Sequence, residues 1–293
     1  MITIILQGGL GNQMYQYAAA KSLATRLNTE VRMDLSVFKI HQQKSWCRPY
    51  ELDVFDFDAI KFSATSFMKK SWLALLMQHG NKTAIKLLKN ARRVYDSSTC
   101  DINTWENCPD GTTLFGYFAS EKYFKEHHAI ILNDFQFKHP LDERNNTLAN
   151  QIESTNSVSV HIRRGDYLNE VNSKVFAQIS PEWYFKASEI VKEQRSATHF
   201  HFFSDDIEWC RQIFQDLDNT SFIDWNHGAD SYRDMQLMSL CKHNIIPNST
   251  FSWWGAWLNA NPNKMVIAPA TFFVNADQNE GYRKNMPKDW ILL

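Results

Sequence analysis

The stretch SVSVHIRRGDY, residues 157–167, is a short β-branched run that ends in two adjacent arginines. Its composition predicts a strand over 158–162 with a loop directly after it. Strand and helix patterns then alternate toward the C-terminus. The further predicted strands are 199–203, 222–225, 244–247 and 265–268, and the predicted helices are 181–195, 207–217, 231–241 and 251–259. This alternation predicts a doubly wound, mostly parallel α/β sheet whose ligand lies beyond the carboxyl ends of the strands.

The N-terminal residues repeat this pattern on a smaller scale. A strand is predicted over 2–6, a glycine turn over 8–11, a helix through Tyr17 and Ala24, and a second strand over 29–35. The turn departs from the dinucleotide-binding fingerprint, because Met14 stands where a third glycine is wanted. Its glycines still allow the backbone to approach a ligand closely. We therefore expect a βαβ unit that is not built for a dinucleotide.

Two further segments divide the chain. Residues 62–94 are basic with helical spacing, which predicts a helical insertion whose charges are solvated. The stretch 142–157 is polar, contains no apolar run, and is predicted to join two lobes. We expect an N-terminal lobe over 1–150, carrying the helical insertion, and a C-terminal lobe over 151–293.

Composition restricts the class of function. The chain has 293 residues, of which 44% are hydrophobic, enough for two cores. The formal net charge of -1 gives no global field that would attract nucleic acid or anionic lipid, so any phosphate must be met by a local site. Five cysteines without a C-x-x-C pair argue against a disulfide framework and a zinc site. Without a long apolar run or a signal-like N-terminus, the expected location is cytoplasmic.

The first candidate site residues are Arg163 and Arg164, at the predicted ligand edge of the sheet. Guanidinium groups match phosphate oxygens in a planar, bidentate manner, which lysine cannot do. The alternative is that both arginines form surface ion pairs.

The segment FSDD, residues 203–206, ends another predicted strand. Asp205 and Asp206 could hold Mg²⁺ or Mn²⁺ against a diphosphate. Alternatively, Ser204 or Asp205 caps the helix that begins near Ile207, where carboxylates are favoured by the helix dipole. We favour the capping interpretation, because the arginines already supply a countercharge.

The segment NSTFSWW, residues 248–254, lies between a predicted strand and a predicted helix. Small hydroxyl residues and free backbone N–H groups at a helix N-terminus make an anion site. The predicted ligand groups are Asn248, Ser249, Thr250 and Ser252. Helix capping alone would explain Asn248 or Ser249 but would not require all four. Asp234, on the preceding predicted helix, could reach the edge of a nucleotide base.

Four motifs in this order resemble glycosyltransferase family 11, the α-1,2-fucosyltransferases. They are GGLGNQM at 8–14, HIRRGDY at 161–167, FSDD at 203–206 and NSTFSWW at 248–254. The resemblance implies a two-lobed GT-B fold with Rossmann-like domains. It also implies GDP-fucose bound to the C-terminal lobe, an acceptor-side N-terminal lobe, no metal or other cofactor, and inverting transfer to the O2 of a terminal galactose.

The resemblance also assigns residues. Arg163 matches the arginine that holds the β-phosphate, and His161 and Asp234 match positions that contact guanine. The 249–252 stretch matches a phosphate-facing loop, and Arg164 is expected on the substrate side. Asn12 and Gln13 match a loop that reaches the cleft between lobes, where Gly11 would allow close approach. Alternatively, Asn12 only caps the helix that begins near Gln13.

The proton acceptor for the reaction stays open. Asp166 follows the arginines and is the predicted general base, Glu170 is the nearby rival, and a loose transition state could let the departing phosphate take the proton. Asp166 could equally be ion-paired to an arginine.

The expected partners are GDP-fucose and a galactose-terminated glycan, and no nucleic acid. Golgi members carry a membrane anchor, and none is expected here because the sequence has no long apolar run, so the resemblance is to a bacterial member. It would build surface glycans such as O-antigen and work close to a membrane through a lipid-linked acceptor. Three other functions stay open: transfer with another linkage, a noncatalytic nucleotide-sugar-binding protein, and a nucleotide-dependent oxidoreductase.

Overall fold

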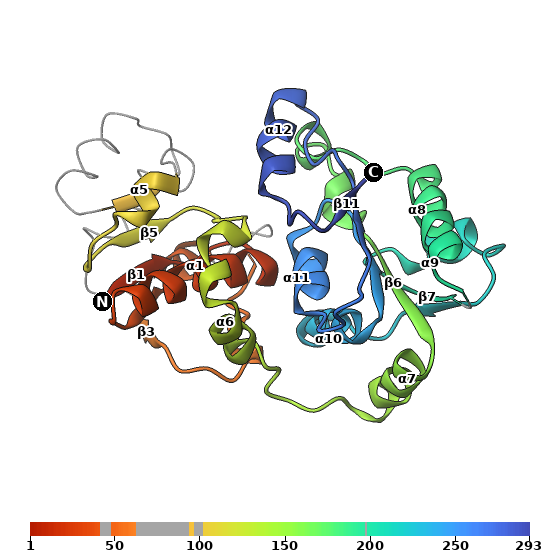
Figure 1. The fold of residues 1–293 in the computed structure, drawn as a ribbon, viewed down its shortest axis with the longest axis horizontal. Coiled ribbons are helices and arrows are strands. Elements are labelled where there is room, and N and C mark those ends of the chain that lie inside the picture. Colours follow the sequence, from red (N-terminus) through yellow and green to blue (C-terminus); the bar gives the residue numbers. More distant parts are fainter. Residues whose placement is uncertain (42–47, 63–93, 97–101, 197) are drawn as a thin grey trace. The chain divides into compact units, whose positions relative to one another are not determined.

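The computed structural model describes residues 1–41, 48–62, 94–96, 102–196 and 198–293. The chain forms two compact units, a first unit of residues 1–138 and a second unit of residues 139–293 (Figure 1). The predicted helical insertion lies almost wholly at 63–93, outside the described residues. Each unit is built around its own parallel sheet.

The first unit contains a five-stranded sheet in the order β3-β2-β1-β5-β4, with every pairing parallel. Its strands are β1 (Ile2–Ile5), β2 (Val31–Asp34), β3 (Ile60–Phe62), β4 (Val94–Asp96) and β5 (Thr113–Phe115). Its helices are α1 (Leu10–Arg26), α2 (Ser36–His41), α5 (Ile102–Glu106) and α6 (His128–Asp134). The predicted βαβ opening is confirmed by β1, α1 and β2.

The turn between β1 and α1 depends on glycine. Gly8 has φ of +79°, in the left-handed region that favours glycine, and a Cβ there would lie 2.6 Å from the Asn12 side-chain nitrogen. Helix α1 begins at Leu10 after Gly9, so the capping alternative for Asn12 is wrong: Asn12 already lies within the first turn.

The second unit contains a six-stranded sheet in the order β11-β10-β9-β6-β7-β8, again with parallel pairings. Its strands are β6 (Asn156–Ile162), β7 (Thr198–Ser204), β8 (Thr220–Ile223), β9 (His243–Ile245), β10 (Val266–Ala268) and β11 (Ile291–Leu292). Its helices are α7 (Glu143–Ser154), α8 (Pro181–Gln194), α9 (Ile207–Ile213), α10 (Tyr232–Leu240), α11 (Thr250–Leu258) and α12 (Ala276–Asn285). Figure 1 shows α8 and α9 on one side of this sheet and α10 and α11 on the other.

The sheet is positioned by a buried core. Val158, Val160, Phe200, Phe202 and Ile245 are fully buried on β6, β7 and β9, and residues of α8 and α9 pack against them. Because parallel sheets are covered on both faces, polar as well as apolar residues of these strands are buried, among them Ser157, Ser159 and His201. The predicted doubly wound α/β sheet is confirmed.

The polar stretch 142–157 differs from its predicted role as a linker, because most of it forms α7. Asp142 caps α7 by accepting a hydrogen bond from the Asn145 N–H at 3.0 Å. Leu148 and Ile152 lie one turn apart and are buried, which supplies the apolar stripe that a helix needs. The chain divides earlier, after Lys138.

Candidate functional site

The strand order of the second unit fixes where a ligand can bind. The chain runs outward from β6 through β7 to β8 on one side, and from β9 through β10 to β11 on the other. The order therefore reverses between the neighbours β6 and β9, and in such sheets a crevice opens at the carboxyl ends of these two strands. The residues that follow β6 begin at Arg163, and those that follow β9 include 246–249. The topology thus brings two of the sequence motifs to one crevice edge.

A direct contact joins the two motifs. The Tyr167 hydroxyl donates a hydrogen bond to the Asn248 carbonyl oxygen at 2.9 Å. Tyr167 lies in the short 3₁₀ turn Gly165–Leu168, directly after the two arginines. The loop after β6 and the turn after β9 are therefore neighbours.

Arg163 is held between two carboxylates. One Nη lies 2.5 Å from Asp166 Oδ1 and the other lies 2.9 Å from Asp205 Oδ2, and the side chain is 22% exposed. Such charge-assisted contacts fix the plane of a guanidinium group. The alternative that Asp166 is ion-paired to an arginine is what the structure shows.

Arg164 is held in a different way. Its Nε lies 2.9 Å from Asp206 Oδ2, and its guanidinium carbon lies 3.9 Å from the centre of the Trp209 ring. Both partners belong to the start of α9. Arg164 therefore packs along α9, an arrangement that supports the local fold.

The FSDD segment has the capping role that we favoured, although Asp206, not Ser204 or Asp205, is the capping residue. Asp206 Oδ1 accepts a hydrogen bond from the Trp209 N–H at 3.4 Å. Asp205 instead accepts from the Arg164 N–H at 2.9 Å while pairing with Arg163. A Cβ at Gly165 would lie 2.6 Å from Asp205 Oδ2, so only glycine fits there without displacing the carboxylate.

The four predicted ligand residues after β9 differ in how the structure holds them. The Asn248 side-chain amide donates to the carbonyl oxygens of Ala177 and Phe272, both at 2.9 Å, and Asn248 is buried. Ser252 is fully buried and donates to the Ser249 carbonyl at 3.3 Å. Both side chains are buried and donate hydrogen bonds within the chain, so neither is exposed for binding a ligand. Ser249 precedes α11 without a side-chain capping bond, and Thr250 is the first residue of the helix and is partly exposed.

His161 is the penultimate residue of β6 and lies near the start of α11. It is 6% exposed, and burial, together with the charge of Arg163, lowers the pKa of its imidazole to about 3. The ring is therefore neutral at physiological pH. Its Nδ1 is buried without a hydrogen-bond partner among the described residues, and its ring centre lies 5.7 Å from that of Phe251. A buried nitrogen without a partner is costly unless a ligand or water satisfies it.

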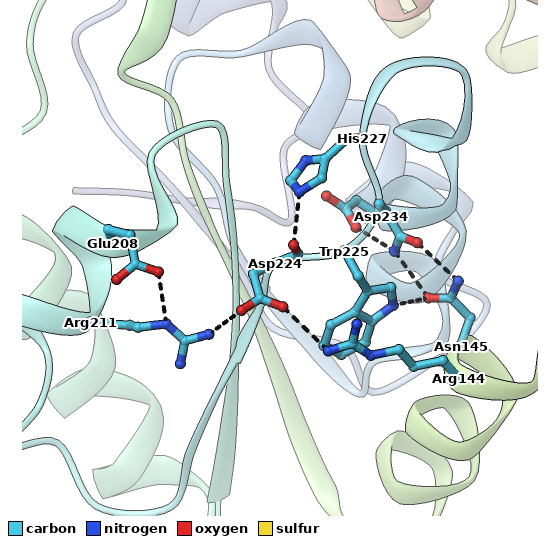
Figure 2. A network of polar contacts seen from close by, with 9 residues as sticks. Arg144, Asn145, Glu208, Arg211, Asp224, Trp225, His227 and Asp234 are labelled. Atoms are coloured by element: carbon cyan, nitrogen blue, oxygen red, sulfur yellow. Dashed lines mark hydrogen bonds and ion pairs between the residues drawn. The ribbon is translucent and has the colours of Figure 1, made fainter.

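Asp234 lies in the first turn of α10, within a polar network (Figure 2). It accepts a hydrogen bond from the Asn226 amide at 2.8 Å, and Asn226 and Asn145 exchange bonds at 2.9 and 3.0 Å. Burial raises the pKa of Asp234 to about 7, against the opposing effect of the Asn226 bond. Trp225 donates to Asn145 at 2.9 Å behind this pair.

The predicted N-terminal residues lie on the first turn of α1, at the carboxyl end of β1. Gly11 is buried and Asn12 is partly exposed. Gln13 is fully buried, donates to Gly8 and Pro49 carbonyls at 2.8 Å, and accepts from the Glu51 N–H at 2.9 Å. Both polar atoms of the Gln13 side chain form hydrogen bonds within the chain, so Gln13 stabilises the glycine turn.

Sequence reasoning missed several residues of these edges. Gln16 is fully buried and joins Gln7 N–H to the Gly116 carbonyl. The Glu51 carboxylate accepts from the Leu10 N–H at the start of α1, and burial raises its pKa. The sequence shows Gln16 within the predicted helix but does not show that it is buried, and no local signal marks Glu51. The rival base Glu170 is exposed and paired with Lys174 at 3.0 Å.

Among the described residues, no group of three or more His, Cys, Asp or Glu side chains is arranged to hold a metal ion. No helix in the described part of the chain is both long and apolar enough to cross a membrane.

The chain is similar in sequence to known glycosyltransferases. Residues 81–293 match the model of the family described as "Glycosyl transferase family 11". An Escherichia coli "Alpha-1,2-colitosyltransferase" is 32% identical over 98% of this chain and 97% of its own length. The Bos taurus "Galactoside 2-alpha-L-fucosyltransferase SEC1" is 28% identical over 50% of this chain and 41% of its own length.

A solved structure is similar in fold. The crystal structure of NodZ α-1,6-fucosyltransferase soaked with GDP-fucose aligns with a TM-score of 0.54 at 14% identity. The alignment covers 88% of this chain and 92% of NodZ. The predicted GT-B type fold is confirmed by this likeness.

Proposed function

Because the chain belongs to glycosyltransferase family 11, we propose that it transfers L-fucose from GDP-fucose to the O2 of a terminal galactose in a glycan. The proposal includes inversion at the anomeric carbon and no metal requirement. The observation that supports it is Arg163, held by Asp166 and Asp205 beyond the carboxyl end of β6, next to β9, where the strand order reverses.

Arg163 is proposed to act on the leaving group. As the bond between fucose and phosphate breaks, negative charge grows on the β-phosphate. A donor fixed before the reaction stabilises that charge without reorganising, and one such donor is typically worth about 2.7–4 kcal/mol. The two carboxylates hold the guanidinium in place, and the N–H groups of the first turn of α11 would add a second, uncharged donor set.

His161 and Asp234 are proposed to receive the guanine base. A carboxylate accepts hydrogen bonds, and guanine offers N–H donors on its Watson–Crick edge. Neutral His161 has an unsatisfied ring nitrogen that can bond to an uncharged ligand group. Ser249 and Thr250 are proposed to face the phosphates, and Asn12, whose amide can both donate and accept, to align the acceptor hydroxyl.

The ion pairs of Asp166 and Glu170 bear on the identity of the proton acceptor. Asp166 is engaged with Arg163 and Glu170 with Lys174, so neither carboxylate is poised to take a proton. We propose that Asp166 holds Arg163 and that the departing phosphate takes the proton from the acceptor hydroxyl. Comparing the pH–rate profiles of Asp166→Asn and Glu170→Gln tests this, because loss of the acidic limb in either variant would restore that residue as the base.

A second donor is favoured by one specific observation. The relative that is 32% identical over nearly the whole chain is named for colitosyl transfer. Nucleotide-activated colitose therefore belongs in the same assay as GDP-fucose. The higher kcat/KM identifies the preferred donor.

The experiment that tests the proposed function incubates the chain with GDP-fucose and a panel of galactose-terminated acceptors. We expect GDP release to depend on the acceptor. We also expect NMR of the product to show fucose linked to the O2 of galactose. GDP binding without transfer to any acceptor would favour a noncatalytic nucleotide-sugar-binding protein. Metal independence is tested in parallel: EDTA should leave the rate unchanged, and a strong loss restored by one particular metal would contradict it.

A further inference from the structure

Three segments of the second unit meet at Asn248. Its carbonyl accepts from the Tyr167 hydroxyl, and its side-chain amide donates to the carbonyls of Ala177 and Phe272, each at 2.9 Å. Tyr167 and Ala177 belong to the loop after β6, and Phe272 belongs to the segment after β10. One buried asparagine thus joins the turn after β9 to both neighbouring loops.

The loop after β6 is also packed against the segment after β10. The Tyr167 ring stacks on Phe176 with centres 4.5 Å apart and planes 11° apart. Phe176 pairs with Phe273 through an antiparallel bridge, and the Val274 N–H donates to the Val175 carbonyl at 2.9 Å. These contacts hold the ring of Tyr167 independently of its hydroxyl.

The ring of Tyr167 is held by packing, so the hydroxyl can be assessed separately through its hydrogen bond to Asn248. Its bond to Asn248 spans from the loop after β6, which carries Arg163 and Asp166, to the turn that starts α11. On the proposed function, these turns supply the charged and the uncharged donors to the same diphosphate. We propose that Tyr167 is a positioning residue that sets the spacing between Arg163 and the N-terminus of α11.

The spacing matters most in the transition state. A diphosphate in the ground state can adjust to a slightly wider site, whereas stabilisation of developing charge requires donors already in place. Misplacement of about 1 Å can cost up to about a hundredfold in rate. The loss of this one bond should therefore lower kcat more than it raises the donor KM.

The test is Tyr167→Phe, which keeps the ring stack and removes only the hydroxyl. We expect kcat to fall about tenfold, the GDP-fucose KM to change less than about twofold, and Tm to fall by no more than about 2–4 °C. The matched control is Tyr17→Phe in the first unit, which removes a buried 2.7 Å bond from the Tyr17 hydroxyl to Asp134. That variant should lose Tm and keep its kcat.

The outcomes separate the two proposals, because the unaltered protein is assayed in parallel. Unaltered protein that neither binds GDP nor transfers fucose contradicts the proposed function, and the inference falls with it. Normal transfer by the unaltered protein with an equal kcat in Tyr167→Phe overturns the inference alone. A fall in kcat matched by an equal fall in Tyr17→Phe also overturns it, because general loosening of the fold would then explain both.

Discussion

Asp234 shows how burial of one residue would make ligand binding depend on pH. An exposed aspartate has a pKa of about 3.9, whereas burial raises that of Asp234 to about 7. Guanine N–H groups need the ionised carboxylate as their acceptor. We therefore expect the affinity for GDP, measured by calorimetry, to rise between pH 6 and pH 8. The rise should be absent in Asp234→Asn, and an identical pH profile in that variant would remove Asp234 from the base site.

The raised pKa of Asp234 should make the free energy of unfolding fall as the pH rises, whereas the affinity for GDP should increase. Because the folded chain holds the Asp234 proton more tightly than the unfolded chain, this residue stabilises the fold fully below about pH 3.9. That stabilisation is lost as the pH rises through about 7. The unfolding free energy of the unaltered protein should thus fall between pH 4 and pH 7 relative to that of Asp234→Asn. A constant difference between them in urea titrations would contradict the raised pKa.

Single residues also show the limit of motif reasoning. The spacing and chemistry of HIRRGDY predicted Arg163, and the capping rules predicted that the FSDD carboxylates serve the start of α9, where Asp206 is the cap. The same reasoning assigned Gln13, Asn248 and Ser252 to the substrate, yet their polar atoms bond within the chain. Asn248 reaches a carbonyl 71 positions away in sequence, and no local pattern reports such a contact.

At the scale of elements, one glycine allows the loop after β6 to pack against the residues that precede α9. Gly165 lies against Asp205, so Gly165→Ala must displace the carboxylate that holds Arg163. We expect kcat to fall about tenfold or more, since a donor moved by about 1 Å can lose up to about a hundredfold. Steady-state kinetics at a temperature below the unfolding transition measures this.

Gly281→Ala is the matched control for that substitution. Gly281 lies inside α12, and a Cβ there meets nothing within 4 Å. Alanine should stabilise the helix by about 0.5–1 kcal/mol and leave kcat unchanged. Equal kinetic effects of the two substitutions would show that the contact with Asp205 is not responsible.

Element prediction failed where tertiary contacts outweigh local pattern. The stretch 142–157 has mostly polar residues, but Leu148 and Ile152 suffice for a helix once a partner buries them. Strand β11, which pairs with β10, has only two residues, so its sequence pattern is too short to recognise. Strands β6 and β7 were predicted to within two residues at each end, because β-branched or aromatic residues recur along both.

At the scale of the whole molecule, the two units should respond to different ligands. Hydrogen exchange of the full chain measures this directly. GDP should protect backbone amides in 163–178 and 247–252 of the second unit, while amides in 8–13 of the first unit stay unprotected. Adding a galactose-terminated acceptor should then protect 8–13. Protection of 8–13 by GDP alone would contradict the assignment of the nucleotide to the second unit.

The presence of two α/β units could be predicted from the sequence, because each contains alternating strand and helix patterns whose periodicity is local. The exact strand order could not, because it depends on which side of β6 each later strand joins. That order is what brings Arg163 and the start of α11 to one edge.

The most direct test of the central claim is the turnover of Arg163→Lys with GDP-fucose and acceptor at saturation. Lysine keeps the charge but loses the planar, bidentate geometry, so we predict a loss of about a hundredfold or more. Arg164→Lys, which loses its contacts with Asp206 and Trp209, should lower Tm and reduce turnover much less. A folded Arg163→Lys protein with near-normal turnover would contradict the role of Arg163 at the β-phosphate.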